Sequence, residues 1–202
     1  MATLRGSGVT LAPLKREHAP ALVEAASDGE LWALEVTTVP SATTVDAYIE
    51  RALVGAADGT MLPFVIKLGK AGTVIGSTRF WRMDAKTRSL EIGHTWIAKS
   101  QQGSFVNPAI KYLMLRYAFE IINCMRVQFM TDENNAHSRA AILKLGAKEE
   151  GILRQERIMP DGRKRNSAIY SIIDSEWPEV KATLEARLRA LNVEPSFSAM
   201  TF

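Results

Sequence analysis

A polar loop that runs into an apolar helix is the first feature of the sequence that suggests ligand binding. Residues 100–108 read SQQGSFVNP, and the segment after them is apolar at helical spacing. Asn107 is a favourable N-cap and Pro108 suits the first helical position, so we expect the helix to begin there. Free N–H groups in the first turn and the helix dipole favour an anion such as a phosphate. Any capped helix shares these features, so the loop alone leaves a purely structural role open.

A predicted strand directly before this loop carries two titratable residues. Residues 89–97, SLEIGHTWI, divide by strict alternation into two faces, one with Leu90, Ile92, His94 and Trp96 and the other with Glu91, Gly93 and Thr95. Glu91 is either a proton acceptor or a surface charge on an antiparallel sheet. His94 titrates near neutral pH, but a lone histidine on an apolar face is more often a packed core residue.

Hydrophobic periodicity predicts the elements that must position these residues. Strands are expected at 8–12, 62–68, 73–82, 89–97, 126–131, 151–159 and 165–173, and helices at 15–34, 43–53, 107–121, 136–145 and 176–191. The piece over 89–131 is long enough for a crossover between two parallel strands. We predict a single mixed α/β domain over residues 1–192, with a mostly antiparallel sheet, one splayed parallel strand pair and flanking helices. Residues 193–202 are expected to form a loosely ordered tail.

Composition narrows the class of protein. With 202 residues, 47% of them hydrophobic and 23% charged, the chain suits one soluble globular domain. No apolar segment predicts a signal peptide or a membrane span. Cys124 is the only cysteine, and we expect it to be a packing residue. Both observations favour a cytoplasmic location for the protein. The net charge of +3 is too small and dispersed to predict a nucleic-acid partner. No residue grouping has metal-ligand spacing, so no metal is expected.

Five segments in the right order resemble the GNAT superfamily of acyl-CoA-dependent N-acyltransferases. They are VTLAPLKREHAPAL, LEIGHTWI, the loop and helix ending in YAFE, TDENNAHSRAAILKLGAKEEGILR and GRKRNSAIYSIIDSEW, which together span roughly residues 8–180. Within the superfamily the chain looks most like the branch of ribosomal-protein N-terminal (alanine/serine) acetyltransferases. The resemblance implies a GNAT-like domain that uses acetyl-CoA, or coenzyme A, as cosubstrate.

The family's pyrophosphate loop, Gln/Arg-x-x-Gly-x-Gly/Ala, can be placed on this sequence in two ways. Anchored on the expected helix start, it aligns Gln102 with its first residue, Phe105 with the first glycine and Asn107 with the second. Anchored on Gly103, it keeps one glycine but moves the helix start by two residues, and we expect the first placement. Phe105 is the departure from the pattern, and it is compatible with phosphate binding when its φ is negative and its ring turns away.

The resemblance also implies roles for individual residues. Glu91 matches the strand glutamate proposed as general base, Asn135 would contact the pantetheine arm, and Ser138 would donate a proton to the leaving thiolate. Asn135 and Ser138 are equally at home in a turn and helix start. A backbone N–H around Thr95–Ile97 would stabilise the oxyanion. The implied cofactor-binding residues are Trp96, Ile97, Gln102, Gly103, Ser104, Phe105, Val106, Asn107, Asn135 and Ser138.

The predicted function is therefore direct transfer of acetyl from acetyl-CoA to a primary amine. No acyl-enzyme is expected, because Cys124 lies outside the predicted slot. The acceptor is a protein N-terminus or a small-molecule amine, and the sequence does not decide between them. The alternative is a non-catalytic GNAT-fold module that binds coenzyme A or a partner through an impaired loop. A homodimer through the C-terminal helix or the tail is also open. Arg163-Lys164-Arg165 meets an acidic substrate or is a solvated hairpin tip.

Overall fold

The structure, a computed structural model, describes residues 2–34, 36–159 and 161–201. A nine-stranded sheet in the order β7-β8-β6-β5-β4-β3-β2-β1-β9 runs through this described part. Its strands are β1 (Ala2–Gly6), β2 (Val9–Pro13), β3 (Leu62–Leu68), β4 (Thr73–Asp84), β5 (Ser89–Ile97), β6 (Arg126–Asp132), β7 (Lys148–Ile158), β8 (Lys164–Ile173) and β9 (Ser198–Thr201). The α-helices are α1 (Ala19–Ser27), α2 (Val45–Ala57), α3 (Val106–Arg116), α4 (Ala136–Leu143) and α5 (Trp177–Ala190).

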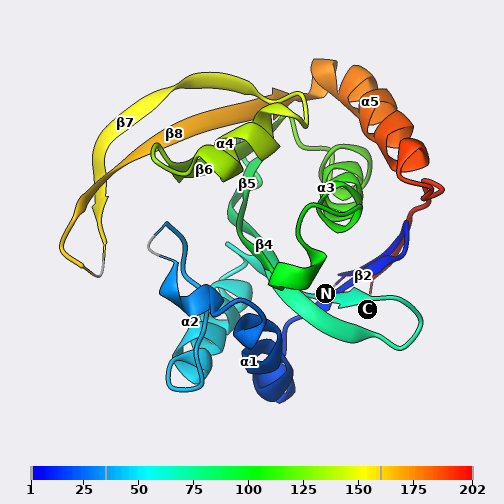
Figure 1. The fold of residues 1–202 in the computed structure, drawn as a ribbon. Helices are drawn as coiled ribbons and strands as arrows, with labels where there is room; N and C mark the ends of the chain where they lie inside the picture. Colours follow the sequence, from blue (N-terminus) through cyan, green and yellow to red (C-terminus); the bar gives the residue numbers. More distant parts are fainter. Residues whose placement is uncertain (1, 35, 160, 202) are drawn as a thin grey trace.

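Helices cover both faces of this curved sheet (Figure 1). On one face, α3 and α5 pack against apolar side chains of the central strands, and Leu113 of α3 and Leu184 of α5 have no exposed surface. On the other face, α1 and α2 enclose a second apolar cluster that includes Leu22 and Ile49. The sheet is therefore buried on both sides at its centre, and a ligand must enter between strands or at an edge.

Most element boundaries agree with the sequence prediction, and the differences have local causes. β3 and β5 have the predicted limits. The first predicted helix is shorter, because Gly29 and Glu30 take positive φ values of 91° and 47° and end it at Ser27. β1 was not predicted. The helix that begins with α3 continues as a π-helical turn over Tyr117–Ile121, and Ile121 at its end is 52% exposed.

A β-bulge in β5 changes which way its side chains point. Ser77 of β4 pairs with Trp96, but Arg79 pairs with Gly93, so two residues of β5, His94 and Thr95, lie opposite Thr78 alone. His94 has a φ of 50°. The prediction of strict alternation is wrong beyond this point.

Beyond the bulge, the side chains of β5 point to the opposite face of the sheet from the one that strict alternation predicts. Leu90 and Ile92 pack in the cluster under α3, whereas Trp96 packs with α1 and α2. His94 contacts Trp81, which is the strand partner of Glu91, so His94 lies on the face of Glu91 rather than on the apolar face.

The predicted parallel pair is present and it opens as predicted. β5 and β6 pair in parallel at three positions, the last of which joins Glu91 to Gln128. Beyond it, β6 pairs only with β8 as far as Asp132, and β5 pairs only with β4. The two strands therefore separate at Glu91, and one edge of β5 has no strand partner from there to Ile97.

The end of the chain is paired with its beginning, which differs from the loosely ordered tail expected from the sequence. β9 pairs with β1 in antiparallel register from Ala2–Thr201 to Arg5–Ser198. Ser7 and Ser196 exchange hydrogen bonds, including one of 2.8 Å from the Ser7 N–H to Ser196 Oγ. The Arg116 guanidinium lies 4.6 Å from the centroid of the Phe197 ring.

We predict that a chain ending at Asn192 loses about 2–4 kcal/mol of unfolding free energy, because it lacks the cross-strand contacts of β9 and the packing of Phe197. Urea unfolding followed by circular dichroism measures this loss. Glu194→Ala is the control, since its side chain is 80% exposed and its ion pair with Arg189 is long, at 3.8 Å. An unchanged midpoint in the truncated chain would show that β9 adds nothing to stability.

Candidate active site

The loop between β5 and α3 presents unpaired backbone donors. Within the described part of the chain, the N–H groups of Gly103, Ser104 and Phe105 donate no hydrogen bond. Gly103 has a φ of 71°, a conformation that suits glycine, and open space surrounds it. Consecutive free N–H groups before a helix form an anion site. The loop therefore fits the diphosphate expected from the sequence.

The helix after this loop begins earlier than predicted. Val106 is its first residue and its N–H donates to Ser104 Oγ at 3.2 Å, so Asn107 is not the N-cap. Pro108 is tolerated in the first turn, because the N–H that it lacks would have no helical acceptor there. Val106 lies two residues before Pro108, the expected first helical position, and this difference favours the placement of the family pattern on Gly103.

Phe105 meets both conditions set for it by the sequence analysis. Its φ is −67°. Its ring is directed toward the turn between β1 and β2, since a methyl group built on Gly8 would lie 3.1 Å from the ring. The side chain also packs against the main apolar cluster. The ring is therefore a packing group of the loop.

Gln102 and Trp96 have structural contacts that limit their possible roles. The Gln102 side-chain amide donates to the Ile97 carbonyl at 2.9 Å and ties the loop to the end of β5. The buried Trp96 indole donates to Tyr48 Oη at 3.1 Å on the opposite face from α3. Only the backbone of Trp96 is thus available to a ligand in the gap.

Glu91 lies at the point where β5 and β6 separate, and it is 2% exposed. Burial raises the pKa of its carboxyl group, while the charge of Arg82 and a hydrogen bond from Gln128 act in the opposite direction. The Gln128 amide lies 3.2 Å and Arg82 Nη1 lies 3.5 Å from Glu91 Oε2. Glu91 is therefore a buried acid with a shifted pKa and not a solvated surface charge.

His94 lies on the same face, with its ring 4.9 Å from the Trp81 ring in an edge-on arrangement. Burial and the charges of four arginines, Arg79, Arg157, Arg51 and Arg165, lower its pKa to about 3. The imidazole is therefore neutral at physiological pH, which excludes a role as a protonated acid.

Asn135 and Ser138 lie where β6 passes into α4. Asn135 Oδ1 accepts a hydrogen bond of 3.0 Å from the Ser138 N–H and caps α4. This cap leaves the Asn135 amide NH₂ and the Ser138 hydroxyl without a hydrogen bond among the described residues. The cap and a role in ligand binding are thus compatible, because they use different atoms.

Lys111 of α3 is a residue that the sequence analysis missed. It is 7% exposed, its Nζ donates to Thr95 Oγ1 at 3.0 Å, and its Nζ lies 5.8 Å from the centroid of the Phe129 ring of β6. The ammonium therefore bridges β5 and β6 beyond the point where they separate. Burial lowers its pKa to about 7. A charged residue in the apolar segment AIKYLML was the available sequence signal.

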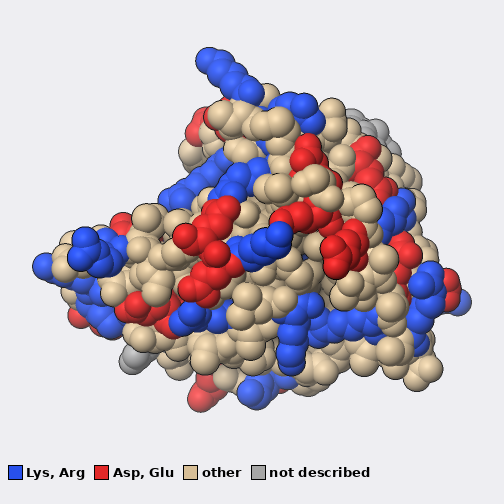
Figure 2. Space-filling view, turned by 90° about the horizontal axis from the view of Figure 1, so that it is seen from above, with Lys and Arg blue, Asp and Glu red and all other residues tan. Residues whose placement is uncertain are grey.

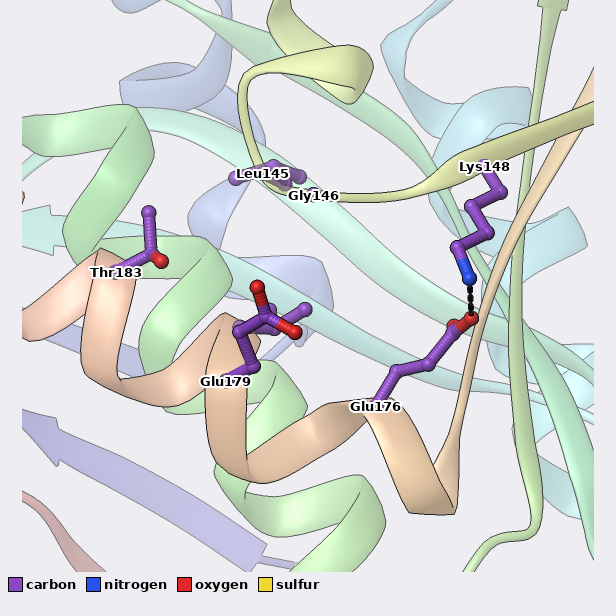
Figure 3. Close-up of a pocket in the computed structure, with 7 residues that line it drawn as sticks. Leu145, Gly146, Lys148, Glu176, Glu179 and Thr183 are labelled. Carbon is purple, nitrogen blue, oxygen red and sulfur yellow. Dashed lines mark ion pairs between the residues drawn. The ribbon is translucent and has the colours of Figure 1, made fainter.

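Two cavities lie outside the gap. One lies between α5 and the connection from α4 to β7, beside the Lys148–Glu176 ion pair, and none of the predicted site residues lines it (Figure 3). The other, of about 250 Å³, lies between the α1–α2 connection and the β7–β8 hairpin, and its lining includes Trp32, Val39 and Met159. The face in Figure 2 shows basic and acidic side chains interspersed.

The described residues contain neither a candidate metal site nor a candidate membrane-spanning helix. They contain no group of three or more His, Cys, Asp or Glu placed to hold a metal ion. None of the helices in the described part of the chain is both long and apolar enough to span a membrane.

Comparison with known proteins identifies the family. Residues 9–148 match the model of the acetyltransferase (GNAT) domain, so the chain belongs to this family. It is 36% identical to a "putative acetyltransferase" from T. thermophilus, whose crystal structure superposes with a TM-score of 0.80 over 92% of this chain and 96% of that one. It shares its fold with Mycobacterium smegmatis RimJ, solved with CoA-disulfide, at a TM-score of 0.78, 24% identity and 96% coverage of both chains.

Among curated proteins, the chain is 31% identical over 106 residues to the Bacillus subtilis protein named "Putative ribosomal N-acetyltransferase YdaF". This match covers 52% of the chain and 57% of YdaF. A second match, to the B. subtilis protein named "Uncharacterized N-acetyltransferase YoaA", is 28% identical and covers 50% of the chain and 55% of that protein. The chain thus spans little more than half the length of the curated relatives that it matches.

We predict that Lys111→Met raises stability at pH 6.5 by about 3–5 kcal/mol, and that this gain shrinks as the pH rises toward 10. The sign follows from the lowered pKa of Lys111. The unfolded chain keeps this proton up to about pH 10.5 while the folded chain loses it above about pH 7. Urea unfolding at several pH values measures the difference, with the exposed Lys70→Met as control. A gain that does not depend on pH would contradict the assignment.

Proposed function

We propose that this protein is an acetyl-CoA-dependent N-acetyltransferase that moves the acetyl group directly to a primary amine. One observation carries the proposal: two functional features lie along β5. The buried carboxylate of Glu91 lies where β5 separates from β6, and the loop with free N–H groups follows the end of β5. Membership of the GNAT acetyltransferase family supports it, as does the CoA-bound structure of RimJ, which shares this fold.

The loop supplies the binding site for the diphosphate of acetyl-CoA. The N–H groups of Gly103, Ser104 and Phe105 would donate to its oxygens, with the dipole of α3 behind them. The pantetheine arm would then lie in the gap between β5 and β6. There the Asn135 amide and the free edge of β5 near Trp96 and Ile97 offer hydrogen bonds.

Glu91 is the general base of this proposal. An amine must be neutral to attack the thioester, and deprotonation at pH 7 costs roughly 1 kcal/mol for an α-amine and 4–5 kcal/mol for a lysine. Glu91 would take that proton directly or through water. A backbone N–H around Thr95 would stabilise the oxyanion, and the Ser138 hydroxyl would protonate the thiolate as the carbon–sulfur bond breaks.

The names of two relatives support one class of acceptor. The names of YdaF and of a Vibrio cholerae neighbour refer to ribosomal proteins, which favours a protein N-terminus. A small-molecule amine is the second candidate, supported by the 250 Å³ cavity beside the β7–β8 hairpin.

For the cosubstrate, we predict that Gly103→Val weakens acetyl-CoA binding at least tenfold, because a β-branched residue is strained at a φ of 71°. Phe105→Gly should bind no more tightly than the parent, since the ring faces the β1–β2 turn. Calorimetric titration measures both. Binding by Phe105→Gly alone would instead favour the non-catalytic alternative.

For the base, we predict that Glu91→Gln lowers kcat by about 10²–10⁴ while leaving acetyl-CoA binding intact. Activity should fall as the pH decreases through the raised pKa of Glu91, since a protonated carboxyl cannot accept the amine proton. Gln128→Leu, which removes a donor to the carboxylate, should move this limb to higher pH. Thiol release with dithiobis(nitrobenzoic acid) provides the rates. A limb unmoved in Gln128→Leu would exclude Glu91 as its origin.

A further inference from the structure

Two arginines on the Glu91 face of the sheet are buried without a carboxylate partner. Arg79 of β4 is 3% exposed and Arg165 of β8 is 7% exposed. No carboxylate among the described residues forms an ion pair with either of them, although Arg82, Arg157 and Arg163 nearby are all paired. Removing a guanidinium from water is costly, so a buried arginine normally has an anionic partner.

Arg79 has only neutral contacts. One Nη lies 3.4 Å from the Tyr48 carbonyl oxygen, the other lies 3.7 Å from the Met61 sulfur, and the guanidinium carbon lies 4.4 Å from the centroid of the Tyr48 ring. Its Nε is buried and has no hydrogen-bond partner at all among the described residues. These contacts partly solvate the cation, but they leave its charge uncompensated.

Arg165 also forms no ion pair, because the two carboxylates whose charges act on it, Asp132 and Glu156, are paired with Arg163 and Arg157. Its Nε donates to Ser167 Oγ at 3.0 Å, and Ser167 donates in turn to Glu156 at 3.2 Å. Glu156 accepts a 2.8 Å bond from Arg157 Nε and lies 3.6 Å from Arg82. The outer nitrogens of Arg165 form no hydrogen bond within the described part of the chain.

These cations lie around the place where an amine would meet Glu91. Arg79 is the strand partner of Gly93, and both Arg79 and Arg165 lower the pKa of His94. Trp81, the strand partner of Glu91, has a buried indole N–H that opposes the effect of burial on the pKa of the Glu91 carboxyl group and donates no other hydrogen bond in the described part of the chain. Arg165 is the second residue of β8, close to the turn where Met159 lines the cavity. The face therefore has several donors in excess of its acceptors.

We propose that the acceptor carries a carboxylate close to its reactive amine and that Arg79 and Arg165 bind this carboxylate. Glu91 and the guanidinium groups would then recognise opposite charges of one molecule. The proposal rests on the N-acetyltransferase function proposed above. The carboxylate is either the α-carboxylate of a free amino acid or the side chain of an acidic residue near a peptide N-terminus.

The test separates binding from turnover. Binding is measured by calorimetry with N-acetyl-L-serine and N-acetyl-L-serinamide, which differ only in the carboxylate and contain no titrating amine. Turnover is measured as kcat/KM for two peptides that begin Ser-Glu and Ser-Gln and are otherwise identical. Both assays use the parent, Arg165→Gln and the control Arg154→Gln, which removes the same charge from an exposed position of the hairpin.

We expect a preference of about 10–100-fold for at least one carboxylate-bearing ligand over its neutral partner, as for a charge-assisted hydrogen bond. Arg165→Gln should lose that preference without a change for the neutral ligand, and Arg154→Gln should keep it. A preference for N-acetyl-L-serine identifies a free amino acid, and a preference for the Ser-Glu peptide alone identifies an acidic N-terminus.

The outcomes also distinguish this proposal from the proposed function. Turnover without preference for either carboxylate would overturn the inference and leave the N-acetyltransferase function in place. Selective binding of the carboxylate without turnover of any amine would support the arginine site and count against the function. If Arg165→Gln weakened the charged and the neutral ligand equally while keeping its acetyl-CoA affinity, the role of Arg165 would be structural and the inference would fail.

Discussion

The parting of β5 from β6 after Glu91 is the constraint on which the rest of this structure depends. Inside a sheet, each strand edge is normally hydrogen-bonded to a neighbour, because an unpaired buried amide or carbonyl group is costly. Here the final residues of β5 have a partner on one side only. The helices that follow the two diverging strands, α3 and α4, both begin near this opening. In the proposed function, the unpaired edge, the free loop amides and the Asn135 cap would form one slot for an elongated ligand with amide groups and a diphosphate.

The two sides of the proposed slot carry different ionisable groups, and burial shifts the pKa of a group on each side. On the α3 side, burial lowers the pKa of Lys111 to about 7. On the opposite side, burial raises the pKa of Glu91. Both shifts oppose the charged form of the group, as expected where water is excluded. Around Glu91 the bulge in β5 adds His94 to the same face, and Arg79 and Arg165 add positive charge without a direct ion pair among the described residues. Transfer of a proton from an amine to Glu91 would thus occur in a partly desolvated site with a fixed excess of cations.

Some elements of the fold could be predicted from the sequence and others could not. β3 and β5 were predicted at their observed limits because turn residues flank their runs of apolar and β-branched residues. The start of α3 was missed, because Asn107-Pro108 suggests a cap while the Ser104 hydroxyl takes part in that role in the structure. β9 was missed because a short polar segment becomes a strand only when β1 lies beside it.

By itself, the sequence determined the order of the elements from β2 to α5, the parallel crossover after 89–97 and the likeness to the GNAT family, which the family match confirms, and it predicted an anion site in the loop. These properties depend on local periodicity, turn chemistry and motif spacing. The tertiary structure alone decided that His94 and Trp96 leave the predicted face, that Glu91 and Lys111 are buried, and that Arg79 and Arg165 lack carboxylate partners among the described residues. The physical reason is that contacts between residues far apart in the chain determine all three properties. These contacts place the bulge in β5, bury Glu91 and Lys111, and leave Arg79 and Arg165 without an ion pair in the described part of the chain, and no local sequence pattern encodes them.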